Sequence, residues 1–232
     1  GNGIRAYLKG LGITFCLTAG ICLTPLPGGA ASVAFNEGDL GNFPSQWKTR
    51  EQGGKEVYSV QMDGQGVFLH AESMGNAYTI GRLVSVDLAE HPYLTFSWRA
   101  IELPEGGNEE LKRTNDAALG VYVVFEGWAM PPRVIKYVWS TTLPEGTLTE
   151  SPYSERAKIV VLRTGEEGLG KWHDEEVNVL KDYRRLFEID DVPKVRGIGI
   201  LTDSDNTGSH AAGDYRSFRF SEGADRFAAS RR

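Results

Sequence analysis

Apolar and polar residues alternate along most of the chain after residue 34. In Tyr93–Ile101, the residues Leu94, Phe96 and Trp98 alternate with polar ones, a period of two that is typical of a strand with one buried face. Leu119–Phe125 is apolar on both faces, as expected of a central strand in a two-layer stack, and so is Lys158–Leu162. The pattern predicts strands at Glu56–Met62, Gly66–Glu72, Ala77–Val86, Tyr93–Ile101, Ala117–Glu126, Arg133–Ser140, Lys158–Arg163, Glu175–Val179, Gly197–Thr202 and Tyr215–Phe220.

A helical period occurs at Asn178–Phe187. Val179, Tyr183 and Leu186 share one stripe there, and Asn178 is a suitable N-cap. Many short strands and one helix predict an all-β fold, a single antiparallel β-sandwich of jelly-roll type (galactose-binding or concanavalin-like) over residues 35–221. We expect Gly106–Thr114 to be a mobile surface loop and residues 222–232 to be a flexible tail.

Residues 1–34 have the layout of a secretory signal peptide. Arg5 and Lys9 precede an apolar run, and small residues follow it, with cleavage expected after Ala31 or Ala34. The run is shorter than the roughly 20 residues of a membrane span, so we expect no stable span after cleavage, with an uncleaved anchor as the alternative. The sequence therefore predicts an exported protein, periplasmic or extracellular.

Composition narrows the function classes. Cys16 and Cys22 lie inside the apolar run, so the mature protein has no disulfide, no thiol nucleophile and no Cys-type zinc site. Without Arg5 and Lys9, 23 basic residues face 31 acidic ones, a net charge of −8. The basic residues are scattered along the chain, which argues against nucleic acid as a partner.

A Gly-rich acidic loop connects the last two predicted strands. Counted from Asp203 as position one, Asp205 is third, Thr207 fifth and Asp214 twelfth, the spacing of an oxygen cage for calcium. An equally simple alternative is that these Asp and Asn side chains cap a turn through backbone NH groups. A third is direct ligand contact by side chains of this loop, with Asp203, Asp205, Asn206 and His210 as candidates.

Five tryptophans offer a second kind of site, because sugar rings stack on exposed indole faces. Trp98 and Trp139 lie on apolar strand faces and are expected in the core. Trp128, beside a Pro-Pro turn, and Trp172, after a Gly-rich segment, are the candidate ligand-binding tryptophans.

An enzyme would need an acid or base together with a charge neutraliser. For elimination from an acidic polysaccharide, Arg133, Tyr137 and His173 supply the required side-chain types. For glycoside hydrolysis, Glu126 with Asp203 is one candidate pair of carboxylates. The four histidines lack metal-ligand spacing along the chain, and there is no serine nucleophile elbow or phosphate-binding Gly loop.

The order of motifs resembles DUF3047, a bacterial exported family of unknown function. The resemblance rests on Phe35-Asn-Glu-Gly38, Phe43-Pro with Trp47, Tyr93-Leu-Thr-Phe-Ser-Trp-Arg99, Asp116 with Val121-Tyr-Val-Val-Phe125, Tyr137-Val-Trp139, Trp172 with Asn178-Val and Asp182-Tyr183, and Thr202-Asp-Ser-Asp-Asn-Thr-Gly208. It implies an exported domain without an established activity. The family pattern has arginines where this chain has Gly120 and Val177, so any charge site that they form in relatives is absent here.

These observations favour a non-catalytic domain that binds carbohydrate or another cell-envelope component. A polysaccharide-degrading enzyme, acting by elimination or hydrolysis, and a structural envelope protein without a small ligand are the alternatives.

Overall fold

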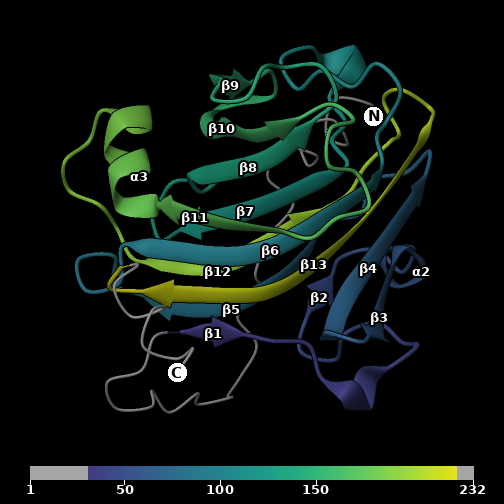
Figure 1. Ribbon diagram of the computed structural model, residues 1–232. Coiled ribbons are helices and arrows are strands. Elements are labelled where there is room, and N and C mark those ends of the chain that lie inside the picture. Colours follow the sequence, from purple (N-terminus) through teal and green to yellow (C-terminus); the bar gives the residue numbers. More distant parts are fainter. Residues whose placement is uncertain (1–30, 224–232) are drawn as a thin grey trace.

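Two β-sheets packed face to face form most of the protein (Figure 1). The computed structural model describes residues 31–223. Its strands are β1 (Ser32–Val33), β2 (Lys48–Thr49), β3 (Tyr58–Asp63), β4 (Gly66–Met74), β5 (Ile80–Val86), β6 (Tyr93–Glu102), β7 (Leu119–Phe125), β8 (Val134–Ser140), β9 (Leu148–Ser151), β10 (Ser154–Thr164), β11 (His173–Asn178), β12 (Val195–Leu201) and β13 (His210–Ser221). The helices are α2 (Gly54–Val57) and α3 (Val179–Phe187), with 3₁₀ turns η1 (Glu37–Asp39) and η2 (Lys112–Thr114).

Sheet A has the order β11-β6-β13-β4-β3, with β1 beside β13, and sheet B has the order β2-β5-β12-β7-β8-β10-β9. The predicted β-sandwich with one short helix is confirmed. The expectation of purely antiparallel pairing is wrong for β8 and β10, which pair in parallel. In the sequence, the short strand β9 comes between β8 and β10, but in the sheet it lies at the edge, antiparallel to β10. Strand β10 therefore runs beside β8 in the same direction as β8.

The core lies between the two sheets. Trp98 of sheet A and Trp139 of sheet B are both fully buried, with ring centroids 6.3 Å apart, as their alternation predicted. Every residue of β7 and β8 is buried, which confirms the prediction of a central strand at Leu119–Phe125. Each large apolar side chain buried in this way stabilises the fold by about 1.5–3 kcal/mol.

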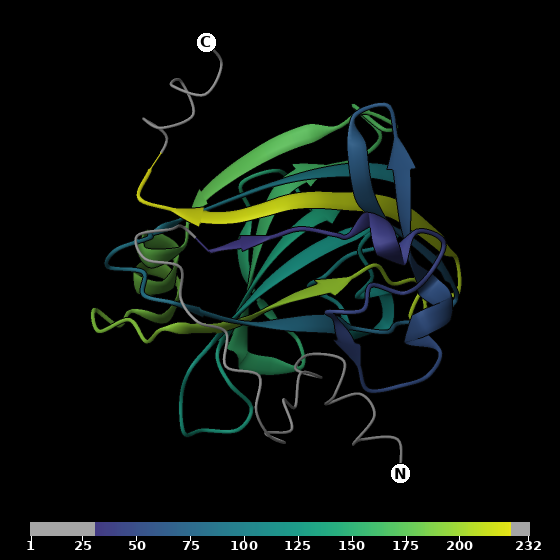
Figure 2. The same ribbon diagram turned by 90° about the horizontal axis from the view of Figure 1, so that it is seen from below.

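Helix α3 closes one end of the sandwich (Figures 1 and 2). The N-cap residue Asn178 accepts a hydrogen bond from Lys181 N at 2.9 Å, and the helix ends at Phe187, followed by the C-cap Glu188 with a left-handed φ of 56°. Tyr183 on the buried side packs on Phe125 at a centroid distance of 4.5 Å. The predicted helix and its N-cap are confirmed.

Several strand boundaries differ from the predictions, among them the start of β10 at Ser154 rather than Lys158 and that of β11 at His173 rather than Glu175. Strand β13 begins at His210 rather than Tyr215, and β5 begins at Ile80 rather than Ala77. The segment Gly54–Val57 is a helical turn ahead of β3. The early start of β13 matters most, because it converts part of the expected acidic loop into strand.

The segment Gly106–Thr114 lies at the surface, as predicted, but Glu109 anchors it to the sandwich. Glu109 is 2% exposed and accepts a hydrogen bond from Ser140 Oγ at 2.6 Å. Asn108 N donates to Thr114 O at 2.7 Å, which closes the segment on itself. A carboxylate tied to a central strand holds this charged segment against the sandwich.

The chain joins sheet A slightly earlier than expected. Ser32 pairs with Arg219 and Val33 with Phe218, while Phe220 N donates to Ala31 O at 2.8 Å. The sheet thus includes two residues of the segment 1–34 that we assigned to a signal peptide; residues 1–30 of that segment and 224–232 of the expected tail lie outside the described residues. Between Ala31 and Gly223, no helix combines the length and the apolar character needed to cross a membrane.

Candidate functional site

The acidic loop after β12 is fixed to the start of β7, at the end of the sandwich opposite α3 (Figure 1). Asp203 is buried, and its Oδ1 accepts from Ala117 N at 2.9 Å while its own N donates to Ala117 O at 3.2 Å. Ser204 Oγ, also buried, lies 2.8 Å from Ser73 Oγ and accepts from Gly75 N at 2.9 Å. These contacts are long-range, so Asp203 and Ser204 attach the loop to neighbouring segments rather than cap a local turn.

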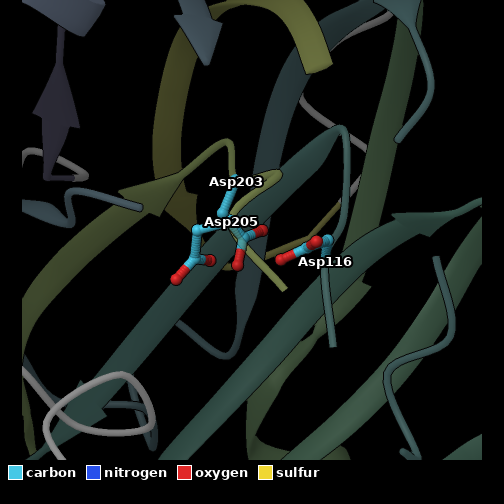
Figure 3. A group of neighbouring side chains, drawn as sticks. All are labelled: Asp116, Asp203 and Asp205. Atoms are coloured by element: carbon cyan, nitrogen blue, oxygen red, sulfur yellow. The ribbon is translucent and has the colours of Figure 1, made fainter. Parts of the chain in front are cut away.

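Asp116 joins Asp203 and Asp205 in an acidic cluster (Figure 3). One carboxylate oxygen from each of the three lies within 4.8 Å of the others, and Asp116 and Asp203 are buried whereas Asp205 is exposed. Asp116 also accepts from the backbone of Asn206 at 3.2 Å and of Thr207 at 2.6 Å. Three carboxylates this close form a donor set that could hold a hard cation.

The twelve-residue calcium cage expected from spacing does not form. Thr207 Oγ1 is engaged locally, 2.7 Å from Ser209 Oγ and 3.3 Å from Ser204 O. Asp214 lies on β13, where the strand pleat directs it away from the loop. The third carboxylate beside Asp203 and Asp205 is that of Asp116, a residue that the sequence indicated only as part of the family pattern.

Asp214 is the centre of a polar network on the outer face of sheet A, the face turned away from sheet B. It is 1% exposed and its Oδ2 accepts from Arg99 Nε at 2.7 Å and Nη2 at 2.6 Å. Its Oδ1 lies 2.7 Å from His70 Nδ1. Beyond His70, Glu72 Oε2 is 3.7 Å from His70 Nε2, and Glu72 Oε1 is 3.1 Å from His210 Nε2.

Trp172 continues this network across the outer face. Its half-buried ring lies under the guanidinium of Arg216, 3.9 Å from the centroid, and within 4.6 Å of the Arg99 guanidinium. Phe68 meets it edge to face at 5.6 Å, and Trp172 Nε1 donates to Asp63 Oδ2 at 3.4 Å. Although Trp172 precedes the edge strand β11, it thus touches side chains of β6, β13, β4 and β3.

Two pKa shifts follow from these contacts. The hydrogen bond to Asp214 raises the pKa of His70, and the nearby charges of Asp214 and Glu72 act in the same direction against its burial. The backbone NH of Gln65 lowers the pKa of Asp63, helped by Trp172. The network therefore stabilises a cationic imidazole and an ionised carboxylate on one surface.

Strand alternation explains how these side chains share a face. Asp214 and Arg216 point outward on β13 while Tyr215 between them is fully buried, and His70 and Glu72 flank the buried Ala71 on β4. His70, Glu72, Arg99, Arg216 and Asp63 were not among the site residues predicted from the sequence. The signal available was polar alternation within the predicted strands, which is indistinguishable from an ordinary solvated face.

The family of the chain follows from comparison with known proteins. Residues 45–219 match the family described as protein of unknown function DUF3047. This chain belongs to the DUF3047 family. The match covers β3 to β12 entirely and β13 as far as Arg219, so it includes both the outer-face network and the acidic cluster. No curated protein matches this DUF3047 chain in sequence.

Solved structures similar to this DUF3047 protein include three of low identity. Endoglucanase 3 of Trichoderma harzianum, from family GH12, has 10% identity, covers 85% of this chain and 99% of its own, and gives a TM-score of 0.43. A carbohydrate-binding module specific for non-crystalline cellulose has 14% identity, covering 85% and 99%, with a TM-score of 0.40. A family 11 carbohydrate-binding module of a Clostridium thermocellum cellulosomal cellulase has 10% identity, covering 84% and 95%, with a TM-score of 0.39.

The sequence-predicted ligand residues of this DUF3047 protein lie at three places. Trp172 and His210 are at two ends of the outer-face network. Asp203, Asp205 and Asn206 are in the acidic loop. Trp128 is fully exposed in the loop between β7 and β8, which protrudes at the end of the sandwich that carries α3 (Figure 2).

The three candidate catalytic side chains are each engaged in a different contact. Tyr137 is fully buried and donates to Asp182 Oδ2 of α3 at 2.8 Å. Arg133 Nη1 donates to Tyr183 OH at 3.2 Å, and His173 Nε2 lies 3.0 Å from Gly168 O. Tyr137 and Arg133 thus attach α3, and His173 attaches the segment before β11. The three side chains are not joined in one site.

The candidate carboxylate pair is also separated. Glu126 directly follows β7, and its N donates to Lys194 O, whereas Asp203 bonds Ala117, which precedes the start of β7. The whole strand β7 lies between the two, so they do not face each other across a cleft.

The two departures from the DUF3047 pattern are buried. A Cβ at Gly120 would lie 3.0 Å from both Leu201 O and the Tyr122 ring, and Gly120 N donates to Tyr215 OH at 3.0 Å. Val177 is 7% exposed and packs in the main core. Neither position is placed to present a charge to solvent in this protein.

Proposed function

We propose that this protein is an exported, non-catalytic domain that binds carbohydrate or another polyhydroxylated component of the cell envelope on the outer face of sheet A. The observation that carries the proposal is the continuous chain of side-chain contacts from His210 through Asp214 to Trp172 and Asp63. This chain of contacts places aromatic, cationic and anionic side chains side by side on one face of the sheet.

The composition of this face suits a sugar. Sugar rings present CH groups to aromatic surfaces and hydroxyls to charged or amide groups around them. The half-buried Trp172 supplies the aromatic surface, the buried Phe68 supports it edge to face, and Asp63 and Arg216 stand beside it. Arg216 Nη2 further donates to Gln65 Oε1 at 2.7 Å, which fixes a guanidinium and an amide at the rim.

Asp214 acts as a positioning residue in this account. It is too deeply buried to meet a ligand, yet it holds both Arg99 and His70 by direct hydrogen bonds. A charge-assisted bond of this kind is short and directional, so it fixes the orientation of the two side chains that solvent reaches. Fixed side chains reduce the entropy lost on binding.

The test is a screen of the purified protein against immobilised bacterial and plant polysaccharides, followed by calorimetry on any glycan that binds. In Trp172→Ala we expect affinity to fall at least about tenfold, a change of about 1.4 kcal/mol. Trp128→Ala is the matched control and should bind like the wild type, with thermal melts confirming that both variants fold. Loss of binding in Trp128→Ala but not in Trp172→Ala would contradict the proposal.

We further propose that the acidic cluster holds a structural calcium ion. Asp116, Asp203 and Asp205 offer hard oxygen donors that lie within 4.8 Å of one another, which is the donor type that calcium prefers. A bound cation would tie the loop after β12 to the segment before β7. Calcium would thereby stabilise the end of the sandwich without taking part in sugar contact.

Export through a signal peptide to the periplasm or the extracellular space completes the proposal. It is supported by the arrangement of Arg5 and Lys9 ahead of an apolar run and small residues. Cleavage after Ala31 would leave strand β1 in sheet A, whereas cleavage after Ala34 would remove it. Mass spectrometry of the exported protein would show which of the two occurs.

A further inference from the structure

The loop between β7 and β8 presents apolar side chains to solvent at its tip. Phe125 at the end of β7 and Val134 at the start of β8 are buried, whereas every residue from Glu126 to Met130 is exposed. Trp128 is completely exposed and Met130 is 65% exposed, with Ala129 between them. Single exposed apolar residues are common, but three in succession on a protruding loop (Figure 2) indicate a contact surface.

The base of this loop is held by hydrogen bonds. Phe125 N donates to Arg133 O at 3.1 Å, which joins the two ends of the loop. Arg156 Nε of β10 donates to Pro131 O at 2.6 Å, just beyond the exposed residues. The apolar tip therefore projects from a fixed support and does not fold back onto the sandwich.

Basic residues stand at the same base. Arg133 and Arg156 are half-buried there, and Lys194, whose carbonyl oxygen accepts from Glu126 N at 2.9 Å, is exposed. Glu126 is the acidic residue of the loop itself, and further acidic residues follow α3 in the segment 188–191. Because this end carries charges of both signs, its most distinctive feature is the apolar tip.

We propose that this loop attaches the protein to a membrane surface by inserting Trp128 and Met130 into the interfacial layer of a phospholipid bilayer. An indole combines an apolar ring with an N–H donor, and tryptophan is accordingly enriched at the level of lipid headgroups. Arg133, Arg156 and Lys194 then lie at the level of the phosphate groups. Apolar burial carries such binding, and attraction to anionic lipids adds to it.

A bilayer suits this loop better than a protein partner does. A specific protein interface covers about 800 Å² on each partner. The tip offers three apolar side chains, of which even the tryptophan buries at most about 250 Å². Lipids rearrange around a small convex tip, so no preformed complementary surface is needed.

The test is co-sedimentation of the purified exported protein with vesicles of phosphatidylethanolamine and phosphatidylglycerol. We expect the wild type to bind and Trp128→Ala to bind at least about tenfold more weakly, because the loop loses its largest apolar side chain. Met130→Ser should also weaken binding. The matched control is Met74→Ser, which should bind like the wild type: Met74 is 67% exposed and ends β4 beside the acidic loop, at the opposite end of the sandwich.

Fluorescence quenching by lipids with brominated acyl chains identifies which tryptophan is inserted. We expect these vesicles to quench the wild type and to leave the fluorescence of Trp128→Phe unquenched. Binding should persist in about 1 M sodium chloride, where the Debye length is only about 3 Å, because apolar contact drives it.

A wild type that does not bind the vesicles would overturn the proposal, also where it self-associates and Trp128→Ala does not, which would make the loop an interface between copies. Equal binding by Trp128→Ala would overturn it as well, and would include attachment through residues 1–30, which all variants share. Loss of binding in high salt would show attraction by charge alone. Because no glycan is present, each result is independent of carbohydrate binding.

Discussion

At the residue scale, two buried carboxylates have opposite surroundings. Asp214 is compensated on both oxygens by Arg99 and His70. Glu109 is equally inaccessible, but only its Oε2 has a partner, Ser140, and its Oε1 is buried without one. A buried charge with incomplete compensation favours the protonated form, whereas a fully paired one is retained as an ion. Asp214 therefore serves the surface network, and Glu109 is a pH-sensitive element of the fold.

Burial raises the pKa of Glu109 from an ordinary value of 4.5 to about 7, with the charge of Asp116 adding to the effect. The native state thus keeps a proton that the unfolded chain releases, so this group makes the protein less stable as the pH rises from about 4.5 to about 7 and adds no further change above that. The full loss corresponds to about 3 kcal/mol. We predict that Glu109→Gln removes this dependence.

Urea unfolding of the wild type and Glu109→Gln from pH 4.5 to 8 checks the prediction. The variant should become progressively more stable than the wild type across this range, by up to about 3 kcal/mol at pH 8. The difference between the two proteins isolates Glu109 from other titrating groups. Curves that stay parallel over the whole range would show that Glu109 is ionised in the native protein throughout.

At the element scale, β13 connects the two candidate sites. Its first residues follow the acidic loop, and its outward side chains His210, Asp214 and Arg216 carry the outer-face network. The strand pairs with both β4 and β6, so the network is built on the centre of sheet A. A cation bound in the loop would therefore steady the start of the strand that presents the surface residues.

The calcium proposal predicts a rise in melting temperature when EGTA is replaced by excess calcium, because a ligand that binds only the native state stabilises it in proportion to saturation. At 100 times the dissociation constant the gain is about 2.7 kcal/mol. Asp205→Asn removes an exposed member of the cluster and should abolish the rise while leaving the melting temperature in EGTA near that of the wild type. Glu105→Gln, an exposed acid outside the cluster, is the control and should keep it. Equal melting temperatures of the wild type in both buffers would refute the calcium site.

At the scale of the whole molecule, the inner and outer faces of the sheets have different roles. The inner faces of both sheets supply the core, including Trp98 and Trp139, and the outer face of sheet A is where aromatic and charged side chains are interleaved. Trp128 lies apart from this face, on the loop between β7 and β8. We therefore expect Trp172 to contact the glycan and Trp128 to stay free of it.

Local pattern was sufficient for most of the fold. The alternation in Tyr93–Ile101 corresponds to β6, and the Asn178 cap and apolar stripe correspond to α3, because both signals arise within one element. The start of β13 was missed because Ala211, Ala212 and Gly213 are small residues with little strand signal. Consequently Asp214 was assigned to the loop.

The candidate site was harder to predict because its contacts are long-range. His70 and Asp214 are 144 positions apart and meet only through the pairing of β4 with β13. Trp172 was a candidate because it follows a Gly-rich segment, but its neighbours on four strands follow from sheet order, which a single sequence does not specify. The contact between Asp116 and Asp203 is long-range too, because most strands of sheet B lie between these two residues in the sequence.

The proposed glycan site is at Trp172 on the outer face of sheet A. The most direct measurement is a ¹H–¹⁵N correlation spectrum of the protein during titration with a glycan that it binds, because each tryptophan indole gives its own signal. We predict that the Trp172 indole signal, assigned with Trp172→Phe, shifts with saturation while that of Trp128 stays fixed. A Trp172 signal that does not move while the glycan binds would contradict the account.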